Sequence, residues 1–132
     1  MNVARKYGQG AELIWSDRKR FLGMPLSFTR YRLVKKPGAW TKLFSDVGFL
    51  FSSIDEVNIY RICDIQFHQS LLGKILNTGT ITLLSSDESM PTFILKNVKN
   101  PLHVRDIFST LMEEQRKLHN VRLTEFHDHD NY

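Results

Sequence analysis

Four consecutive residues near the C-terminus carry the side chains that most often hold divalent metal ions. His127, Asp128, His129 and Asp130 supply two imidazoles and two carboxylates. A structural or catalytic metal site needs ligands held at fixed distances by further contacts, and the sequence has no second cluster to supply them. We therefore predict neither a metal site nor a cofactor, and we assign this segment no activity.

The residue types used in covalent and acid–base catalysis are present, but the surroundings that such chemistry needs are missing. Cys63 alternates with Ile65 and Phe67, a spacing that predicts a buried, unreactive thiol on one face of a strand. No Gly-x-Ser-x-Gly, His-x-Glu or Gly-x-x-x-x-Gly-Lys motif occurs, and no two carboxylates stand out as an acid and a base. The sequence predicts a protein that is not an enzyme.

The basic residues make a stronger case for a function than the metal-ligand and catalytic residue types do, and that function is the binding of anions. Residues 1–42 have a net charge of +8, whereas residues 43–132 have a net charge of −4. Arg30 and Arg32 are two apart on a predicted strand and share a face, where two guanidinium groups can hold one phosphate or carboxylate. A solvated edge strand is the alternative interpretation. The candidate residues for an anion, a phosphate or a lipid headgroup are Lys19, Arg20, Arg30, Arg32, Lys35 and Lys36.

The same basic strand allows nucleic-acid binding as an alternative function. Phe28, Tyr31 and Trp40 interleave with basic residues and could form a stacking platform beside phosphate contacts. Aromatic side chains in strands usually fill the core, which argues against such a platform. Nucleic acid is therefore the alternative partner, bound through residues 30–36.

The connector between two predicted strands is unexpectedly apolar. It reads Leu71-Leu72-Gly73-Lys74-Ile75-Leu76 and is predicted to be a loop. An apolar loop has to be covered by another element, by another chain or by a lipid interface. The candidate interface residues are Leu71, Leu72, Lys74, Ile75 and Leu76.

The occupant of this interface stays open at the level of sequence. A protein partner, a second copy of the chain and an anionic membrane surface all fit, and we favour a seam between copies slightly over lipid insertion. Membrane docking is favoured if the connector lies on the same side as the basic N-terminal third, and loses half of its support if it lies opposite. No small-molecule substrate is expected. The basic residues concerned are Arg5, Lys6, Arg18, Lys19, Arg20, Lys35, Lys36 and Lys42.

A β-rich domain has to position these residues. Alternation of apolar and polar residues predicts about seven strands, the longest of which, residues 56–69, bends between two sheets with Arg61 at the corner. Asn100 and Pro101 predict the start of a helix that continues with an apolar face to Leu118. The other predicted strands are residues 11–18, 26–35, a short segment around Trp40, 47–53, 80–85 and 92–96.

One domain accounts for the whole chain of 132 residues. We expect an N-terminal extension at 1–10, the domain at 11–119 and a polar C-terminal tail at 120–132 that is disordered or loosely docked. The N-terminus lacks the apolar core of a secretory signal, and one cysteine cannot form an internal disulfide. These features predict a cytoplasmic protein, with peripheral attachment to the membrane if the apolar connector meets lipid.

A progression of short motifs resembles the bacterial pleckstrin-homology-like domain family. The motifs are Tyr60-Arg61-Ile62-Cys63-Asp64-Ile65, Gln69-Ser70-Leu71-Leu72 and Gly79-Thr80-Ile81, followed by Asn97-Val98-Lys99-Asn100-Pro101 and a helical run. The resemblance covers roughly Glu12 to Lys117. It implies a mainly β fold, a bent β-barrel of two roughly orthogonal antiparallel sheets with about seven strands, capped by one C-terminal helix.

Overall fold

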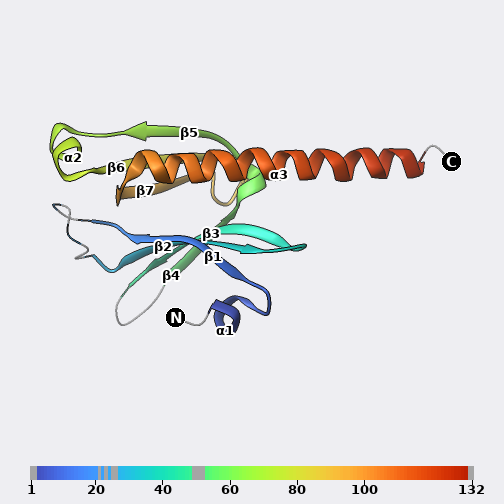
Figure 1. Ribbon diagram of the computed structural model, residues 1–132, viewed down its shortest axis with the longest axis horizontal. Helices are drawn as coiled ribbons and strands as arrows, with labels where there is room; N and C mark the ends of the chain where they lie inside the picture. The colour runs from blue at the N-terminus through green and yellow to red at the C-terminus, as the bar shows by residue number, and fades with distance from the viewer. Residues whose placement is uncertain (1–2, 21, 23, 25–26, 49–52, 131–132) are drawn as a thin grey trace.

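The computed structural model describes residues 3–20, 22, 24, 27–48 and 53–130, with side chains as far as residue 120. It contains seven strands, three α-helices and one 3₁₀ turn (Figure 1). The elements in chain order are α1 (Val3–Tyr7), β1 (Glu12–Arg18), β2 (Thr29–Lys36), β3 (Trp40–Val47), β4 (Ser53–Asn58), the turn η1 (Ile59–Arg61), β5 (Ile62–His68), α2 (Leu71–Leu76), β6 (Thr78–Ser85), β7 (Thr92–Lys99) and α3 (Pro101–Asp130).

The strands form two antiparallel sheets that lie one above the other in Figure 1. One sheet has the order β1-β2-β3-β4 and the other the order β5-β6-β7. The chain crosses between them at η1, which confirms Arg61 as the corner of the long strand segment. Among the described strands each sheet keeps its own two edges, so the sheets are not closed into a barrel. The mainly β class is confirmed, and the bent arrangement fits the expected pleckstrin-homology-like fold.

Side chains from both sheets and from α3 form one core. The ring of Phe108 on α3 is fully buried and meets the Trp15 ring of β1 edge to face, with 5.9 Å between centroids. The alternation predicted for β6 and β7 is confirmed, because its apolar members point into this core. The helix therefore joins the two sheets through shared apolar burial. Core residues with no exposed surface include Leu33, Leu43, Ile59, Ile81, Leu83, Leu95, Val98 and Phe108.

The C-terminal helix begins where the sequence predicts and ends later. Pro101 is its first residue, after Asn100 with a backbone φ of 51°. The Asn100 side-chain oxygen accepts a hydrogen bond from the Asn77 amide, and its carbonyl accepts from the Val104 N–H. The helix continues past Leu118 to Asp130, so the predicted polar tail is helical through that residue. Residues 119–130 contain no Gly or Pro that would end it.

The predicted strand at 47–53 is wrong. β3 ends at Val47, β4 begins at Ser53, and these two residues are paired with each other in an antiparallel ladder. The chain therefore reverses direction between them, after Gly48 with a φ of 134°. Phe49 and Phe51, which were expected to share a face with Val47, lie outside the described residues. An apolar run was mistaken for a strand because apolar content alone does not separate a strand from a connection.

The N-terminal segment forms a short helix against the four-stranded sheet. The Tyr7 ring of α1 packs on Phe44 of β3, with 4.8 Å between centroids. Lys6 lies 3.9 Å from the Asp46 carboxylate on the same strand. α1 therefore covers part of the sheet face that points away from β5, β6 and β7 (Figure 1).

Candidate functional site

The connector at 71–76 is the helix α2 and not a loop. The Ser70 hydroxyl caps it by accepting a hydrogen bond from the Gly73 N–H at 3.0 Å, and Asn77 ends it with a left-handed φ of 54°. Sequence reasoning missed this cap because it weighed the apolar residues alone. No other element of the described chain covers its outer side, since the side chains of Leu71 and Ile75 are 77% and 74% exposed. The exposed neighbours are Leu72 and Lys74, while Leu76 is half-buried.

Gly73 anchors α2 on the adjacent strand. A Cβ at this position would lie 2.6 Å from the Thr78 carbonyl oxygen, which accepts a hydrogen bond from the Gln69 side-chain amide. Gly73 is therefore required for close packing of α2, and the apolar side chains are left on its outer side.

Replacing Gly73 by alanine is expected to lower the free energy of unfolding by about 1–3 kcal/mol, because the backbone must shift to accept the methyl group. Urea denaturation followed by circular dichroism measures this change. Leu71→Ala is the matched control on the same helix and should change stability by less than about 0.5 kcal/mol. Equal stability of Gly73→Ala and the native protein would show that α2 is not held closely against β6.

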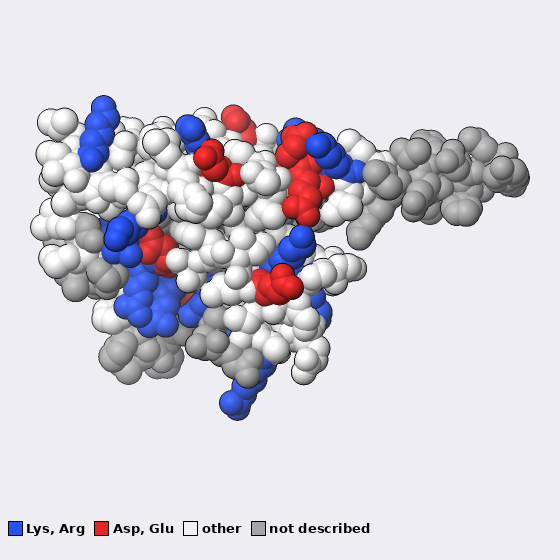
Figure 2. Space-filling model, viewed as in Figure 1, with Lys and Arg blue, Asp and Glu red and all other residues white. Residues whose placement is uncertain are grey.

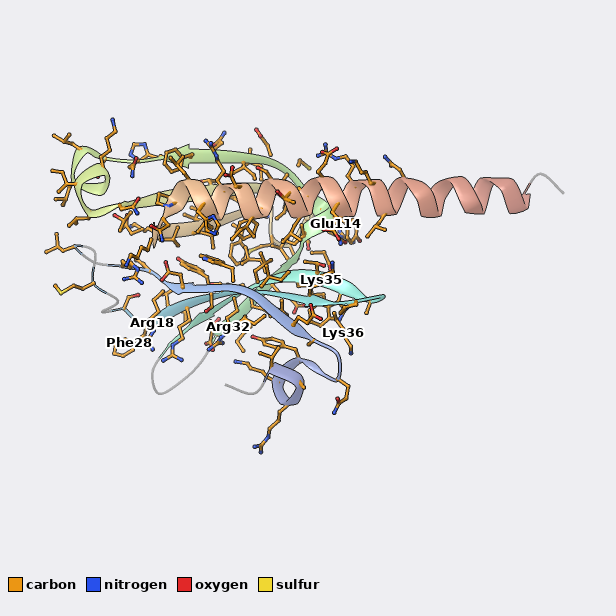
Figure 3. The ribbon with its side chains drawn as sticks, in the orientation of Figure 1. Arg18, Phe28, Arg32, Lys35, Lys36 and Glu114 are labelled. Atoms are coloured by element: carbon orange, nitrogen blue, oxygen red, sulfur yellow. The ribbon has the colours of Figure 1, made fainter. Side chains whose placement is uncertain are left out.

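The basic residues of β1 and β2 form a group on the outer face of the four-stranded sheet. Arg18 pairs directly with Arg30 across the two strands, and Arg32 follows two residues along β2 on the same face. Figure 3 shows Arg18 and Arg32 on the side of the sheet that points away from β5, β6 and β7. A groove of about 450 Å³ lies here, lined by Leu13, Ser16, Asp17, Arg18, Arg20, Arg30, Tyr31 and Arg32.

Ion pairing separates these arginines into two kinds. The Arg32 side chain is only 11% exposed, and its guanidinium lies 3.8 Å from the Asp46 carboxylate, which Lys6 also approaches. Within the part of the chain that the structure describes, no carboxylate lies within 4 Å of the guanidinium groups of Arg18 and Arg30. These two side chains are available to an external anion.

Of the other predicted basic residues, Arg20 lines the same groove but is paired with a carboxylate, and the rest lie elsewhere. Arg20 forms an ion pair with Asp17 at 3.1 Å, and Lys35 forms one with Glu114 of α3 at 3.0 Å. Lys36 lines a separate cavity of about 260 Å³ beside His119 on α3. The Lys19 N–H donates to the Thr29 carbonyl where β2 begins. Arg30 and Arg32 thus line one groove, while Figure 3 shows Lys35 and Lys36 away from Arg32.

Arg18 is a member of the basic group that was not among the candidate anion-binding residues. Ten residues separate β1 from β2, so the sequence does not fix which residues of the two strands face each other. The register that pairs Arg18 with Arg30 appears only in the folded sheet.

Exposed apolar side chains lie near this basic group. Leu22, Met24 and Phe28, all between β1 and β2, are at least half exposed. Figure 3 places Phe28 beside Arg18. The only signal in the sequence is that several apolar residues occupy a connection where polar ones are usual.

Both apolar segments lie at one end of the long axis of the molecule. In Figure 1, α2 and the described part of the β1–β2 connection are at the same end, while the C-terminus of α3 is at the other. Figure 2 shows a group of Lys and Arg side chains over the four-stranded sheet, in the half of the molecule that carries α2. We define the docking end by the exposed residues Leu71, Leu72, Lys74 and Ile75 of α2, Leu22, Met24 and Phe28 of the β1–β2 connection, and the arginines Arg18 and Arg30.

The aromatic platform considered for nucleic acid does not form one surface. Tyr31 is 3% exposed and lies in the core, where its hydroxyl oxygen accepts a hydrogen bond from the Lys96 N–H of β7. Burial raises the pKa of this hydroxyl, which keeps it neutral. Trp40 packs edge to face on Phe44, at the opposite end of β3 from the β1–β2 connection. Of the three aromatic residues, Phe28 lies at the end of the sheet where Figure 3 also shows Arg18.

The prediction that Cys63 is buried is wrong. Its side chain is exposed, because a register shift between Ile62 and Asp64 interrupts the alternation along β5. Ile62 is buried in the core, and Ile65 packs against it.

In the described part of the chain, no three His, Cys, Asp or Glu residues are placed to hold a metal ion. None of the helices within that part is long and apolar enough to cross a membrane. The side chains of His127 to Asp130 lie outside the described set.

No family model, no curated protein and no solved structure matches the chain.

Proposed function

We propose that this chain is a non-catalytic, pleckstrin-homology-like binding module that attaches to an anionic membrane surface through its docking end. One observation carries the proposal: exposed apolar side chains of α2 and of the β1–β2 connection share an end of the molecule with Arg18 and Arg30, which have no carboxylate partner among the described residues. Apolar side chains surrounded by basic residues are typical of surfaces that bind the interface of an anionic bilayer.

Apolar burial and electrostatic attraction contribute comparable free energies to membrane binding. A leucine or isoleucine side chain contributes roughly 1.5–3 kcal/mol when it is fully removed from water. Each Arg or Lys close to an anionic bilayer contributes about 1 kcal/mol, which falls as salt is raised. Neither contribution alone gives strong attachment, whereas together they favour an anionic membrane over a neutral one.

A contact between two copies of the chain is supported less well. An isologous contact uses the same surface patch on both copies. Using the docking end in this way would bring the Arg18–Arg30 pairs of two copies toward each other without added negative charge. A bilayer that contains anionic lipid supplies the complementary charge.

Replacing both Leu71 and Ile75 by aspartate is expected to reduce binding to anionic vesicles by more than about tenfold, because both apolar contacts are lost and negative charge is added. Co-flotation with vesicles of phosphatidylcholine, alone or mixed with phosphatidylglycerol, measures this loss. Leu118→Asp, at an exposed apolar position toward the far end of α3, makes the same chemical change and should leave flotation intact.

Light scattering on the same samples separates lipid docking from self-association. A monomer that floats with anionic vesicles and stops floating in the double variant supports the proposal. Failure of the native protein to float, or flotation that survives the double substitution, rejects it. A multimer that falls apart in the double variant and does not float would instead indicate a seam between copies.

A further inference from the structure

We infer that the cleft between the β2–β3 hairpin and α3 is a binding site for a small zwitterionic ligand, an aromatic α-amino acid. The cleft has a volume of about 260 Å³. In Figure 1 the tip of the hairpin lies under α3, away from α2, so the cleft is separate from the docking end and the inference does not depend on membrane attachment. The described residues that line it include Lys35, Thr41, Asn58, Tyr60, Gln115 and His119.

Three parts of the chain that are distant in sequence form this cleft. The hairpin turns where the Ala39 N–H donates to the Lys36 carbonyl at 3.0 Å, η1 supplies Tyr60, and α3 supplies Gln115 and His119. The volume is just below the range of about 300–1,000 Å³ that is typical of sites for drug-sized ligands, so it suits a molecule of the size of one amino acid. No small-molecule ligand was predicted from the sequence, because no local motif brings these residues together.

The Lys35–Glu114 ion pair supplies both of the charges that a zwitterion requires. Nζ of Lys35 lies 3.0 Å from Oε1 of Glu114, and Figure 3 shows the two side chains meeting from β2 and from α3. An ammonium group has three donors and a carboxylate about four acceptor positions, so one contact leaves most of them unused. The two side chains are 31% and 43% exposed, and a ligand can therefore reach both.

Glu114 disfavours a ligand that carries a carboxylate alone. A carboxylate bound to Lys35 would lie close to the Glu114 carboxylate, and like charges at short distance repel each other. Lys36 does not offset this repulsion, because its Nζ lies beside Gly8 on the opposite face of β2. A free amino acid has an ammonium next to its carboxylate near neutral pH. Each charge of such a ligand meets the opposite charge of the ion pair.

Tyr60 and His119 form an aromatic wall of the cleft that exists before any ligand binds. Their rings are nearly parallel, at 17°, with 5.6 Å between centroids. Arg61 holds the Tyr60 ring from η1, because its Nε donates to the Tyr60 hydroxyl oxygen at 3.1 Å. Tyr60 is nevertheless 47% exposed. An aromatic side chain of the ligand can pack on this wall in the offset or edge-to-face arrangement that aromatic pairs prefer.

Uncharged polar groups of the cleft add hydrogen-bonding capacity. The Asn58 side chain makes no capping hydrogen bond to the η1 turn that follows it. The Gln115 amide donates to the Thr41 hydroxyl oxygen at 3.4 Å, which is long for a hydrogen bond. These side chains can exchange water or a weak contact for a bond to the ligand.

Titration with L-phenylalanine tests the site, followed by nuclear magnetic resonance of the backbone amides of the β2–β3 turn and of α3 around Gln115. Phenylalanine should shift these resonances and leave those of α2 unchanged, with a dissociation constant of about 1 mM or tighter. N-acetyl-L-phenylalanine lacks the ammonium and L-phenylalaninamide lacks the carboxylate, so each should bind about tenfold more weakly. L-Cyclohexylalanine keeps both charges without an aromatic ring and should also bind more weakly.

Glu114→Gln should remove the preference for phenylalanine over N-acetyl-phenylalanine, because the ligand ammonium loses its partner. Glu113→Gln is the matched control, since it makes the same change at the next position of α3, where the carboxylate pairs with Arg116 at 3.8 Å, and it should keep the preference. Exposed ion pairs add little to stability, so both variants should melt close to the native temperature. Tyr60→Leu should weaken the binding of phenylalanine and keep the preference.

The outcomes decide the identity of the ligand and the existence of the site separately from the membrane function. A preference for phenylalanine that Glu114→Gln removes and Glu113→Gln keeps supports the inference. Equal binding of phenylalanine and N-acetyl-phenylalanine to the native protein overturns the assignment to an amino acid. Absence of shifts at the cleft with phenylalanine at roughly 10 mM overturns the site. Vesicle flotation should be the same for Glu114→Gln and the native protein, so failure of either proposal leaves the other intact.

Discussion

Replacing Phe108 by alanine is expected to lower the free energy of unfolding by about 3–5 kcal/mol. The Phe108 ring has no exposed surface and lies between the two sheets, where it also meets Trp15 edge to face. Its removal loses apolar burial and leaves a cavity bordered by both sheets and α3, because stacked sheets cannot close around the gap without shifting.

A loss of this size is a large part of the total stability of a domain, which is about 5–15 kcal/mol. Guanidinium denaturation monitored by tryptophan fluorescence measures it, since Trp15 contacts the substituted ring. Leu102→Ala is the matched control on the same helix, because Leu102 is 53% exposed. The control should cost less than about 1 kcal/mol. A Phe108 variant as stable as the control would mean that α3 is not part of the core.

Replacing Asp17 by alanine is expected to cost about 2–4 kcal/mol, the second largest effect, although Asp17 lies in the basic N-terminal third. Its carboxylate accepts hydrogen bonds from the Arg20 guanidinium and from the Lys99 N–H, and so joins β1 to the end of β7. The alanine variant leaves that N–H without its acceptor and removes the negative partner of Arg20.

Thermal and urea denaturation of Asp17→Ala and Asp17→Asn test this connection between the sheets. The asparagine variant keeps an oxygen acceptor but loses the charge, so its stability should fall between those of alanine and the native protein. Asp55→Ala, at an exposed position on β4, is the control and should change stability by less than about 0.5 kcal/mol. If the Asp17 variants are as stable as Asp55→Ala, water replaces the Asp17 carboxylate without loss of stability.

Ion pairs with Asp17 and Glu114 explain why the predicted anion-binding residues did not form one site. Spacing along a strand correctly placed Arg30 and Arg32 on one face, because successive side chains of a strand alternate. Arg20 and Lys35 were grouped with them by charge alone. Their partners, Asp17 and Glu114, are set by the folded register and by the packing of α3, which local spacing does not encode.

The sequence by itself determined the local features of this protein. Alternation identified the buried side of β6 and β7, Pro101 marked the start of α3, and the apolar composition singled out residues 71–76, whose outer side chains are exposed. These properties depend on residues that are close in the chain. Apolar side chains recur at the period of a strand or a helix, and an apolar connector stands out by its composition.

Only the tertiary structure decided which of these features act together. The pairing of Arg18 with Arg30, the burial of Tyr31 and the exposure of Cys63 depend on strand register, including the irregularity between Ile62 and Asp64. The common position of α2 and the β1–β2 connection depends on the stacking of two sheets across η1. Register and stacking are set by contacts between residues far apart in the chain, and a shift of one residue would move each side chain to the other face.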